Sequence, residues 1–291
     1  MQLCDNKYAY KRHSVDDFPL LKTPLITEPH FYTVGKFNPD MVKNSVGVIG
    51  SRRLSNYGRV VTTRFVKSLA ELNIPVVSGF MYGADLLAHK TSLENNNYTV
   101  GILGWGVSYL PGSQYKDIYN AICQDGCLLS FYEPNFSGAK WSFVKRNKYL
   151  ASIVKTLIVI EAGENSGTVE TAKHMFAQNK KVFIVAANIN SPGCAGLKTI
   201  AKLGGNDTEI IFDIEPVIKY LGMSKTARNT VVVNIKGETL LSIYRMLQEF
   251  PYSFDDLAEK LSIETKLLAI CLSNLELENH IYYERGNYYV K

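Results

Sequence analysis

The sequence lacks the features that mark membrane, secreted and disulfide-stabilised proteins. No stretch of its 291 residues approaches the ~20 consecutive apolar residues that a helix needs to cross a bilayer. The first 18 residues do not have the charged-then-apolar order of a secretory signal, so a cytoplasmic location is expected. The five cysteines are odd in number and scattered, which favours free thiols. Cys123 and Cys127 lie four residues apart, but no second Cys or His pair completes a zinc set.

Motifs for nucleotide cofactors are also absent. The sequence has no G-x-x-x-x-G-K-[ST] loop, and Gly47, Gly50 and Gly58 do not have G-x-G-x-x-G spacing. No acidic residue ends the second predicted strand, where a dinucleotide site holds the ribose. A cofactor-dependent dehydrogenase is therefore disfavoured, and no cofactor is predicted.

Charge is unevenly distributed along the chain. The formal net charge is +5, but residues 1–236 contain 27 Lys and Arg against 18 Asp and Glu, whereas residues 237–291 contain 5 against 9. A basic body suits a polyanionic ligand, although a solvated lysine-rich surface gives the same totals.

Short apolar segments alternate with amphipathic ones between about residues 45 and 221. The apolar segments are β-branched and bounded by Gly, Pro or Asn, which is typical of buried strands. The alternation predicts an α/β fold, an extended Rossmann-like parallel sheet with helices on both faces, whose ligands bind at the carboxyl ends of the strands. The six predicted strands lie in SVGVIG, IPVVSG, YTVGILGWG, CLLSFYEP, TLIVIEAG and KVFIVAAN.

The C-terminal part predicts a small separate domain. Three helical segments precede a hairpin around Arg285–Asn287, which is the order of a winged helix. The third helix carries Glu264, Glu276 and Glu278 against only Lys266, so a protein contact or a packing role is favoured over reading of duplex DNA. The predicted boundaries are a lead-in segment at 1–44, the Rossmann-like domain at 45–221, a linker at 222–236 and the winged helix at 237–291.

Cations and glycines follow the first two predicted strands. Arg52 and Arg53 follow the first, in a strand–glycine–helix sequence whose helix start offers N–H groups to an anion. Gly79 and Gly83 follow the second, and a helix-start role is favoured for the nearby Asp85.

Two further groups follow later strands. In Trp141–Ser152, cations are interleaved with aromatic residues, which suits single-stranded nucleic acid because cations hold phosphates while rings stack on bases. A helix with a solvated basic face is the other interpretation. Ser166, Gly167 and Thr168 open a predicted helix, where their hydroxyl and N–H groups either hold an anion or cap the helix. A parallel sheet brings all four groups to one rim, which favours binding.

The order of these motifs resembles that of the DNA-processing protein A family, also called DprA or Smf. VGVIGSRRLSNYG is similar to the family's VAIVGSRxxSxYG, and VVSGFMYGADLLAHKTSL to VVSGLAxGIDxxAHxxAL. FVKRNKYLASIV stands where the family has FPxRNRIIAGLS, and EAGENSGTVETA where it has EAxxxSGSLxTA. The resemblance covers nearly all of the chain from Asp17 onward.

The resemblance implies a bacterial cytoplasmic protein, usually a homodimer, that binds single-stranded DNA through the Rossmann-like domain. Members of the family protect incoming strands in natural transformation and load the RecA recombinase onto them, and they are not known for catalysis. Arg52 falls on the family's DNA-contacting arginine. The implied DNA-binding residues are Arg52, Arg53, Gly79, Gly83, Phe143, Lys145, Arg146, Asn147, Lys148, Ser166, Gly167, Thr168 and Lys198.

The chain departs from the family pattern at four places. Leu110–Gln114 reads LPGSQ where the family has YPxxN, and Val185–Ala187 replaces VPG. Gly193–Ala195 lacks the asparagine of GxN, and Val144 replaces the proline of FPxRN. A divergent member is therefore expected, with its rim altered near Lys198.

Two other functions are open from the sequence. The "lonely guy" phosphoribohydrolases of the same superfamily use GGxGTxxE, with the final Glu as catalyst, and resemble SGTVET here. Glu170 stands one residue before the position of the final Glu in that motif. On a helix, a shift of one residue turns the side chain by about 100° from the catalytic position. A nucleoside-monophosphate N-glycosidase that uses Glu170 is the alternative enzyme. The third possibility is a nucleotide-sensing or assembly module that docks partners through the acidic winged helix.

Overall fold

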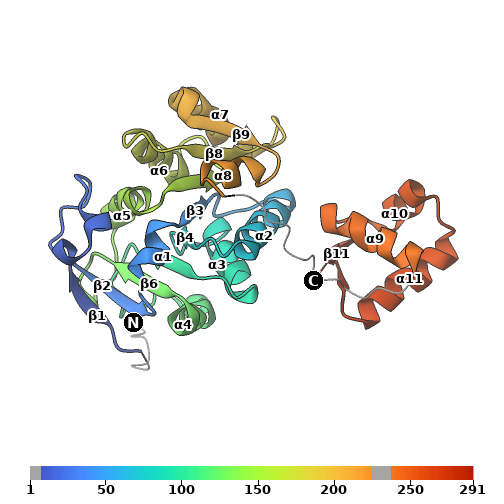
Figure 1. The fold of residues 1–291 in the computed structure, drawn as a ribbon, viewed down its shortest axis with the longest axis horizontal. Coiled ribbons are helices and arrows are strands. Elements are labelled where there is room, and N and C mark those ends of the chain that lie inside the picture. The colour runs from blue at the N-terminus through green and yellow to red at the C-terminus, as the bar shows by residue number, and fades with distance from the viewer. Residues whose placement is uncertain (1–7, 224–236, 291) are drawn as a thin grey trace. The chain divides into compact units, whose positions relative to one another are not determined.

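The computed structural model describes residues 8–223 and 237–290, which form two compact units that divide near residue 225 (Figure 1). Each unit has its own hydrophobic core. Residues 224–236, which make up most of the predicted linker, lie outside the described residues, as does Cys4. None of the described helices is both long and apolar enough to span a bilayer.

A nine-stranded sheet forms the centre of the larger unit, in the order β1-β2-β6-β5-β4-β3-β7-β8-β9. The seven strands β6, β5, β4, β3, β7, β8 and β9 are parallel to their neighbours in the sheet. β2 pairs antiparallel with β6, and β1 pairs antiparallel with β2. This sheet confirms the predicted α/β fold. The strands are β1 Lys11–Ser14, β2 His30–Gly35, β3 Val46–Ile49, β4 Val76–Ser78, β5 Thr99–Ile102, β6 Cys127–Ser130, β7 Thr156–Val159, β8 Val182–Val185 and β9 Thr208–Ile211.

All six predicted strands are present, and three further strands extend the sheet at its two edges. β1 and β2 belong to the predicted lead-in segment at 1–44 and join the same sheet as the rest of the unit. The sequence analysis did not predict β9, because β9 does not form a buried apolar run. It is an edge strand, and three of its four residues are at least partly exposed.

Helices cover both faces of the sheet, as predicted. α5, α6 and α7 pack on one face, and α2, α3, α4 and α8 on the other (Figure 1). Successive strand residues alternate between the two cores, as the period of two in a strand requires. The helices are α1 Pro39–Lys43, α2 Asn56–Glu71, α3 Ala84–Glu94, α4 Lys116–Asp125, α5 Lys140–Ile153, α6 Gly167–Phe176, α7 Ala195–Gly204 and α8 Glu215–Tyr220.

The strand order changes direction between β3 and β7. From β3 the chain adds β4, β5 and β6 on one side, and it then returns to place β7 on the other side of β3. Ligands of doubly wound sheets bind at such a switch point, outside the carboxyl ends of the strands. The turns after β3 and β7 are therefore where a site is expected.

The smaller unit has the order of elements predicted for a winged helix. Three helices, α9 Glu238–Glu249, α10 Phe254–Leu261 and α11 Thr265–Leu277, precede the hairpin of β10 Ile281–Glu284 and β11 Asn287–Val290. The hairpin turns at Arg285 and Gly286, with φ of +51° and +89°. Positive φ at both central residues is the geometry whose twist matches the flanking strands.

Candidate nucleic-acid interface

The turns after β3 and β7 meet at the switch point. The Thr168 hydroxyl, in the first turn of α6, donates to the carbonyl of Gly50 at 3.3 Å. This contact joins the two groups that the sequence placed on a common rim. Arg52 and Arg53 lie in the turn between β3 and α2, and both are exposed. The Ser51 hydroxyl accepts from the Arg53 N–H at 3.0 Å and so holds the turn.

A carboxylate that the sequence analysis missed occupies the start of α2. Glu161 follows β7, is 4% exposed, and accepts from the Ser55 N–H at 3.1 Å and from the Ser55 hydroxyl. A Cβ on Gly58 would lie 2.8 Å from the carboxyl carbon of Glu161, so glycine lets the carboxylate approach the helix. Because a carboxylate is favourable at a helix N-terminus, Glu161 fills the anion position expected there. The structure thus corrects the expectation of an open anion site at this helix start.

Gly79 and Gly83 are required by close packing around the arginine turn. Gly83 has φ of +83°, and a Cβ on it would overlap the carbonyl oxygen of Ser51. A Cβ on Gly79 would overlap the guanidinium of Arg146. Both glycines therefore bring the turn after β4 against its neighbours, and their contact with DNA stays a prediction.

Arg146 lies beneath the rim, and its contact with DNA stays a prediction. It is 5% exposed, and its Nη1 donates to the carbonyls of Gly79 and, at 2.9 Å, Ile102. Its charge also stabilises buried Asp85, which accepts from the Met81 N–H at 3.3 Å. Burial nevertheless raises the pKa of Asp85 to about 6. Arg146 acts here as a structural cation that satisfies strand-end carbonyls.

Lys145 and Lys148 lie on α5, a helix with four cations and no carboxylate. The ammonium of Lys145 forms an ion pair with Glu28, a residue of the segment before β2. The Glu28 side chain is only 15% exposed. Lys148 is half-buried near His174, whose pKa is lowered first by burial and then by this positive charge. The predicted basic face of α5 is present, but one of its cations is paired within the chain.

Phe143 and Asn147 connect α5 to the rim. The Phe143 ring is half-buried, with its centroid 5.7 Å from that of Trp105, a residue that follows β5. The Asn147 amide donates to the Gly167 carbonyl at 3.2 Å. α5 therefore lies beside the carboxyl ends of β5 and β7.

The remaining predicted residues lie on α6 and α7. Ser166 is the N-cap of α6, but its hydroxyl makes no cap hydrogen bond and is buried without a partner within the described residues. The capping interpretation therefore fails for Ser166, while anion binding stays a prediction. Lys198 is exposed on α7 and donates to the Ile189 carbonyl at 3.2 Å.

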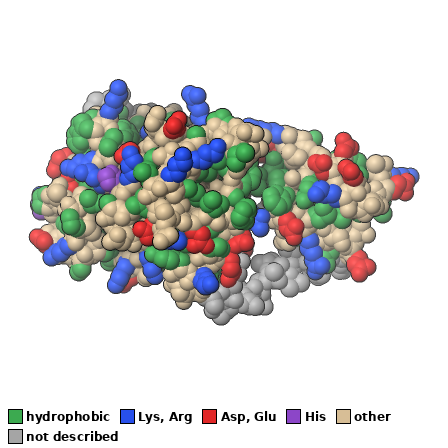
Figure 2. Space-filling model, turned by 90° about the horizontal axis from the view of Figure 1, so that it is seen from above, with side chains coloured by type: hydrophobic (Ala, Val, Ile, Leu, Met, Phe, Trp, Pro, Cys, Tyr) green, Lys and Arg blue, Asp and Glu red, His purple; other side chains and the backbone are tan. Residues whose placement is uncertain are grey.

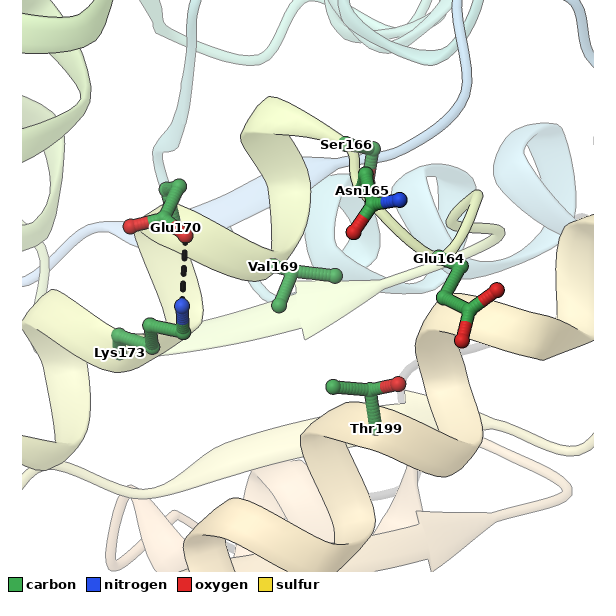
Figure 3. Close-up of a pocket in the computed structure, with 7 residues that line it drawn as sticks. All are labelled: Glu164, Asn165, Ser166, Val169, Glu170, Lys173 and Thr199. Carbon is green, nitrogen blue, oxygen red and sulfur yellow. Dashed lines mark hydrogen bonds and ion pairs between the residues drawn. The ribbon is translucent and has the colours of Figure 1, made fainter.

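Glu170 lies on an open surface. It is exposed and pairs with Lys173 at 2.7 Å, at the edge of a depression of about 260 Å³ formed by α6 and α7 (Figure 3). A catalytic carboxylate usually lies in a cleft that partly excludes water. Glu170 is exposed to solvent instead.

Three other titratable residues noted near the site motifs or as a Cys pair are core residues. His89 is buried, its Nδ1 lies 2.7 Å from the Thr99 hydroxyl, and burial lowers its pKa to about 3, so it is a neutral core residue. Cys123 and Cys127 are both buried, which confirms them as core thiols. Among residues 8–223 and 237–290, no three His, Cys, Asp or Glu side chains are grouped to hold a metal.

Comparison with known proteins identifies the family. The model of the family described as DNA recombination-mediator protein A matches residues 10–221. The chain is 28% identical over 218 residues to DNA processing protein DprA of Streptococcus pneumoniae, covering 73% of each chain. It is 29% identical over 160 residues to protein Smf of Escherichia coli, covering 55% of this chain and 43% of that protein. The match spans about half the length of several curated relatives, including DprA of Bacillus subtilis, at 51%.

Two solved structures share the fold of the larger unit. DNA processing protein A of Helicobacter pylori, described with a single-stranded DNA binding mode, has a TM-score of 0.64 at 23% identity, over 76% of this chain and 98% of that one. DprA of S. pneumoniae has a TM-score of 0.65 at 24% identity, over 74% of each chain. The family match covers most of the chain, and the switch-point motifs lie within it. The chain therefore belongs to the DNA recombination-mediator protein A family.

Proposed function

We propose that this protein binds single-stranded DNA and acts, without catalysis, as a recombination mediator. The binding surface that we propose is the edge of the sheet formed by the turns after β3 and β7, here called the switch-point rim. The observation that carries the proposal is the pair of exposed arginines, Arg52 and Arg53, in the turn after β3. Glu161 already satisfies the helix start behind them, so these side chains supply the positive charge that meets a phosphate backbone. Single-strand binding described for the H. pylori relative supports the same ligand here.

Salt dependence tests this proposal. The affinity for a labelled poly-dT oligonucleotide, measured by fluorescence anisotropy, should fall with added salt, with a log–log slope of about −0.7 for each phosphate contacted. Duplex of equal length should compete poorly, because the rim would stack exposed bases as well as hold phosphates. Affinity that stays flat between low and moderate salt would contradict DNA binding at a cationic rim.

We further propose that the protein passes the bound strand to a RecA-type recombinase. We also propose that it protects incoming strands during natural transformation. The family membership of residues 10–221 supports this role. Recombinase nucleation on single strands, followed through its ATP hydrolysis, should speed up when the protein is added. An unchanged lag at saturating protein would contradict the loading role and leave DNA binding intact.

A homodimer is the assembly that we propose. Within residues 8–223 and 237–290, β9 is an edge strand, and its outer hydrogen-bonding groups would pair with a strand of a second copy. Large apolar side chains are exposed on and near it, with Ile210 at 57% and Phe212 at 78%. A second copy of this edge would cover them. Light scattering should give a dimer for the wild type and a monomer for Phe212→Glu; a monomeric wild type would contradict the dimer.

A further inference from the structure

The outward face of α5 carries an exposed tryptophan. Trp141 is 57% exposed, and the chain's other tryptophan, Trp105, is 1% exposed. Large aromatic side chains on soluble proteins are normally more buried than this. Among the aromatic residues of α5, Tyr149 is fully buried and Phe143 half-buried, so Trp141 is the ring that the helix offers to solvent.

Other aromatic rings hold Trp141 in a fixed orientation. The Phe136 ring lies 5.6 Å away at an interplanar angle of 38°, and the Tyr132 ring lies 5.8 Å away, edge to face. Tyr132 is itself fixed, because its hydroxyl donates to the Ser142 carbonyl at 2.8 Å. An aromatic platform that is already ordered loses little conformational entropy when a ligand stacks on it.

Trp141 lies at the same edge of the sheet as Arg52. Tyr132 and Phe136 follow β6, so they stand at the carboxyl end of a parallel strand of the same sheet. The contacts of Phe143 and Asn147 with the segments after β5 and β7 fix α5 along this edge.

Although Lys145 is paired with Glu28, lysines flank the Trp141 ring on both sides along α5. Lys140 precedes it and is exposed, and Lys145 and Lys148 follow it by four and seven residues, on the same face of the helix. α5 contains no Asp or Glu. Figure 2 shows Lys and Arg side chains on one face of the larger unit, with hydrophobic side chains and some Asp and Glu between them. A protein partner would suit an exposed tryptophan alone, but the cations on its helix favour a polyanion with aromatic bases.

We propose that Trp141 is a base-stacking platform for single-stranded DNA, with Lys140 and Lys148 holding the adjoining phosphates. The platform extends the binding surface from the arginine turn onto the outer face of α5. Stacking on it is independent of sequence, because every base has a π-face. The inference rests on the proposed function, since it names a further contact for the same ligand.

Two substitutions and two ligands test the platform. Trp141→Ala should weaken poly-dT binding by about 5- to 150-fold, the range for loss of one stacked base, while Trp141→Phe should keep most of the affinity. On an abasic deoxyribose-phosphate chain the alanine variant should bind as the wild type does. Val144→Ala, an exposed neighbour on the same face, is the matched control and should bind poly-dT normally. Equal loss on both ligands would contradict stacking.

Fluorescence gives a second readout. Poly-dT should quench the wild type but not Trp141→Phe, in which only buried Trp105 emits. Wild-type anisotropy that shows tight poly-dT binding, with no quenching and no loss in Trp141→Ala, would overturn the platform and leave the proposed function standing; that result would assign the exposed ring to a protein partner. A wild type that does not bind poly-dT would overturn the proposed function itself.

Discussion

At the scale of single residues, Glu28 competes with the phosphate backbone for Lys145. Its carboxylate pairs with the ammonium in a partly shielded position, so this cation is only partly available to DNA. Glu28→Gln should release it, raising poly-dT affinity about fivefold at 0.1 M salt and steepening the log–log salt slope by about 0.7, as expected for one more phosphate contact. Anisotropy across a salt series measures both quantities.

The control for this prediction is Glu94→Gln, which removes the same charge from an exposed position on α3. It should change poly-dT affinity little, because charges more than a Debye length from the strand are screened. Equal gains from the two substitutions would mean that net charge, and not the release of Lys145, sets the affinity.

The raised pKa of Asp85 predicts how the stability of the protein depends on pH. Burial raises its pKa in the folded state to about 6, above the ordinary value of about 3.9 expected for the unfolded chain. Between these values the folded state binds more protons, so this group's contribution to stability is complete below about pH 4 and is lost as the pH rises through 6. The unfolding free energy of the wild type, minus that of Asp85→Asn, should therefore fall by roughly 2–3 kcal/mol from pH 4 to pH 7.

Urea unfolding at four pH values measures this difference. His89 is present in both proteins, so its own titration cancels in the comparison. A constant difference across the range would show that Asp85 is ionised throughout, with Arg146 outweighing the cost of burial.

At the level of helices and strands, Lys180 supplies hydrogen bonds to the C-terminus of α5. The ammonium of Lys180 donates to the carbonyls of Ala151, Ser152 and Val154, at 2.7–2.9 Å. These carbonyls stand at the C-terminus of the helix, where a cation and additional donors are favourable. Lys180→Met should therefore lower the unfolding free energy by about 1–3 kcal/mol, as loss of hydrogen bonds from a charged group does. Chemical denaturation measures this loss. Lys219→Met, at an exposed position of α8, should lower the unfolding free energy little by comparison.

Strand–helix alternation was enough to predict the parallel core and the rim, because buried strands and helix stripes have distinct periods. It missed β9, whose exposed edge position breaks the buried apolar pattern. At the site, exposed Arg52 and the basic face of α5 were predicted, whereas Glu161 was not. A lone acidic residue after an apolar run does not show that it reaches a neighbouring helix, since that contact depends on which strands are adjacent.

In the molecule taken as a whole, the smaller unit has a core of its own, and residues 237–291 contain nine Asp and Glu against five Lys and Arg. We therefore expect it to recruit partners and not to bind the strand. Deletion of residues 237–291 should leave poly-dT affinity within about twofold of the wild type, and should abolish any partner recruitment that this unit provides. Anisotropy and pull-down with the recombinase measure the two effects. A large loss of DNA affinity would place the smaller unit in the DNA site.

We propose above that the switch-point rim binds single-stranded DNA through the arginine turn. The most direct test is poly-dT anisotropy of Arg52→Ala beside Lys90→Ala, which removes one positive charge from an exposed position on α3. Arg52→Ala should lose about fivefold or more in affinity at 0.1 M salt, with a log–log salt slope shallower by about 0.7, and Lys90→Ala should bind nearly as the wild type does. Equal affinities of the two variants would contradict DNA binding through the arginine turn.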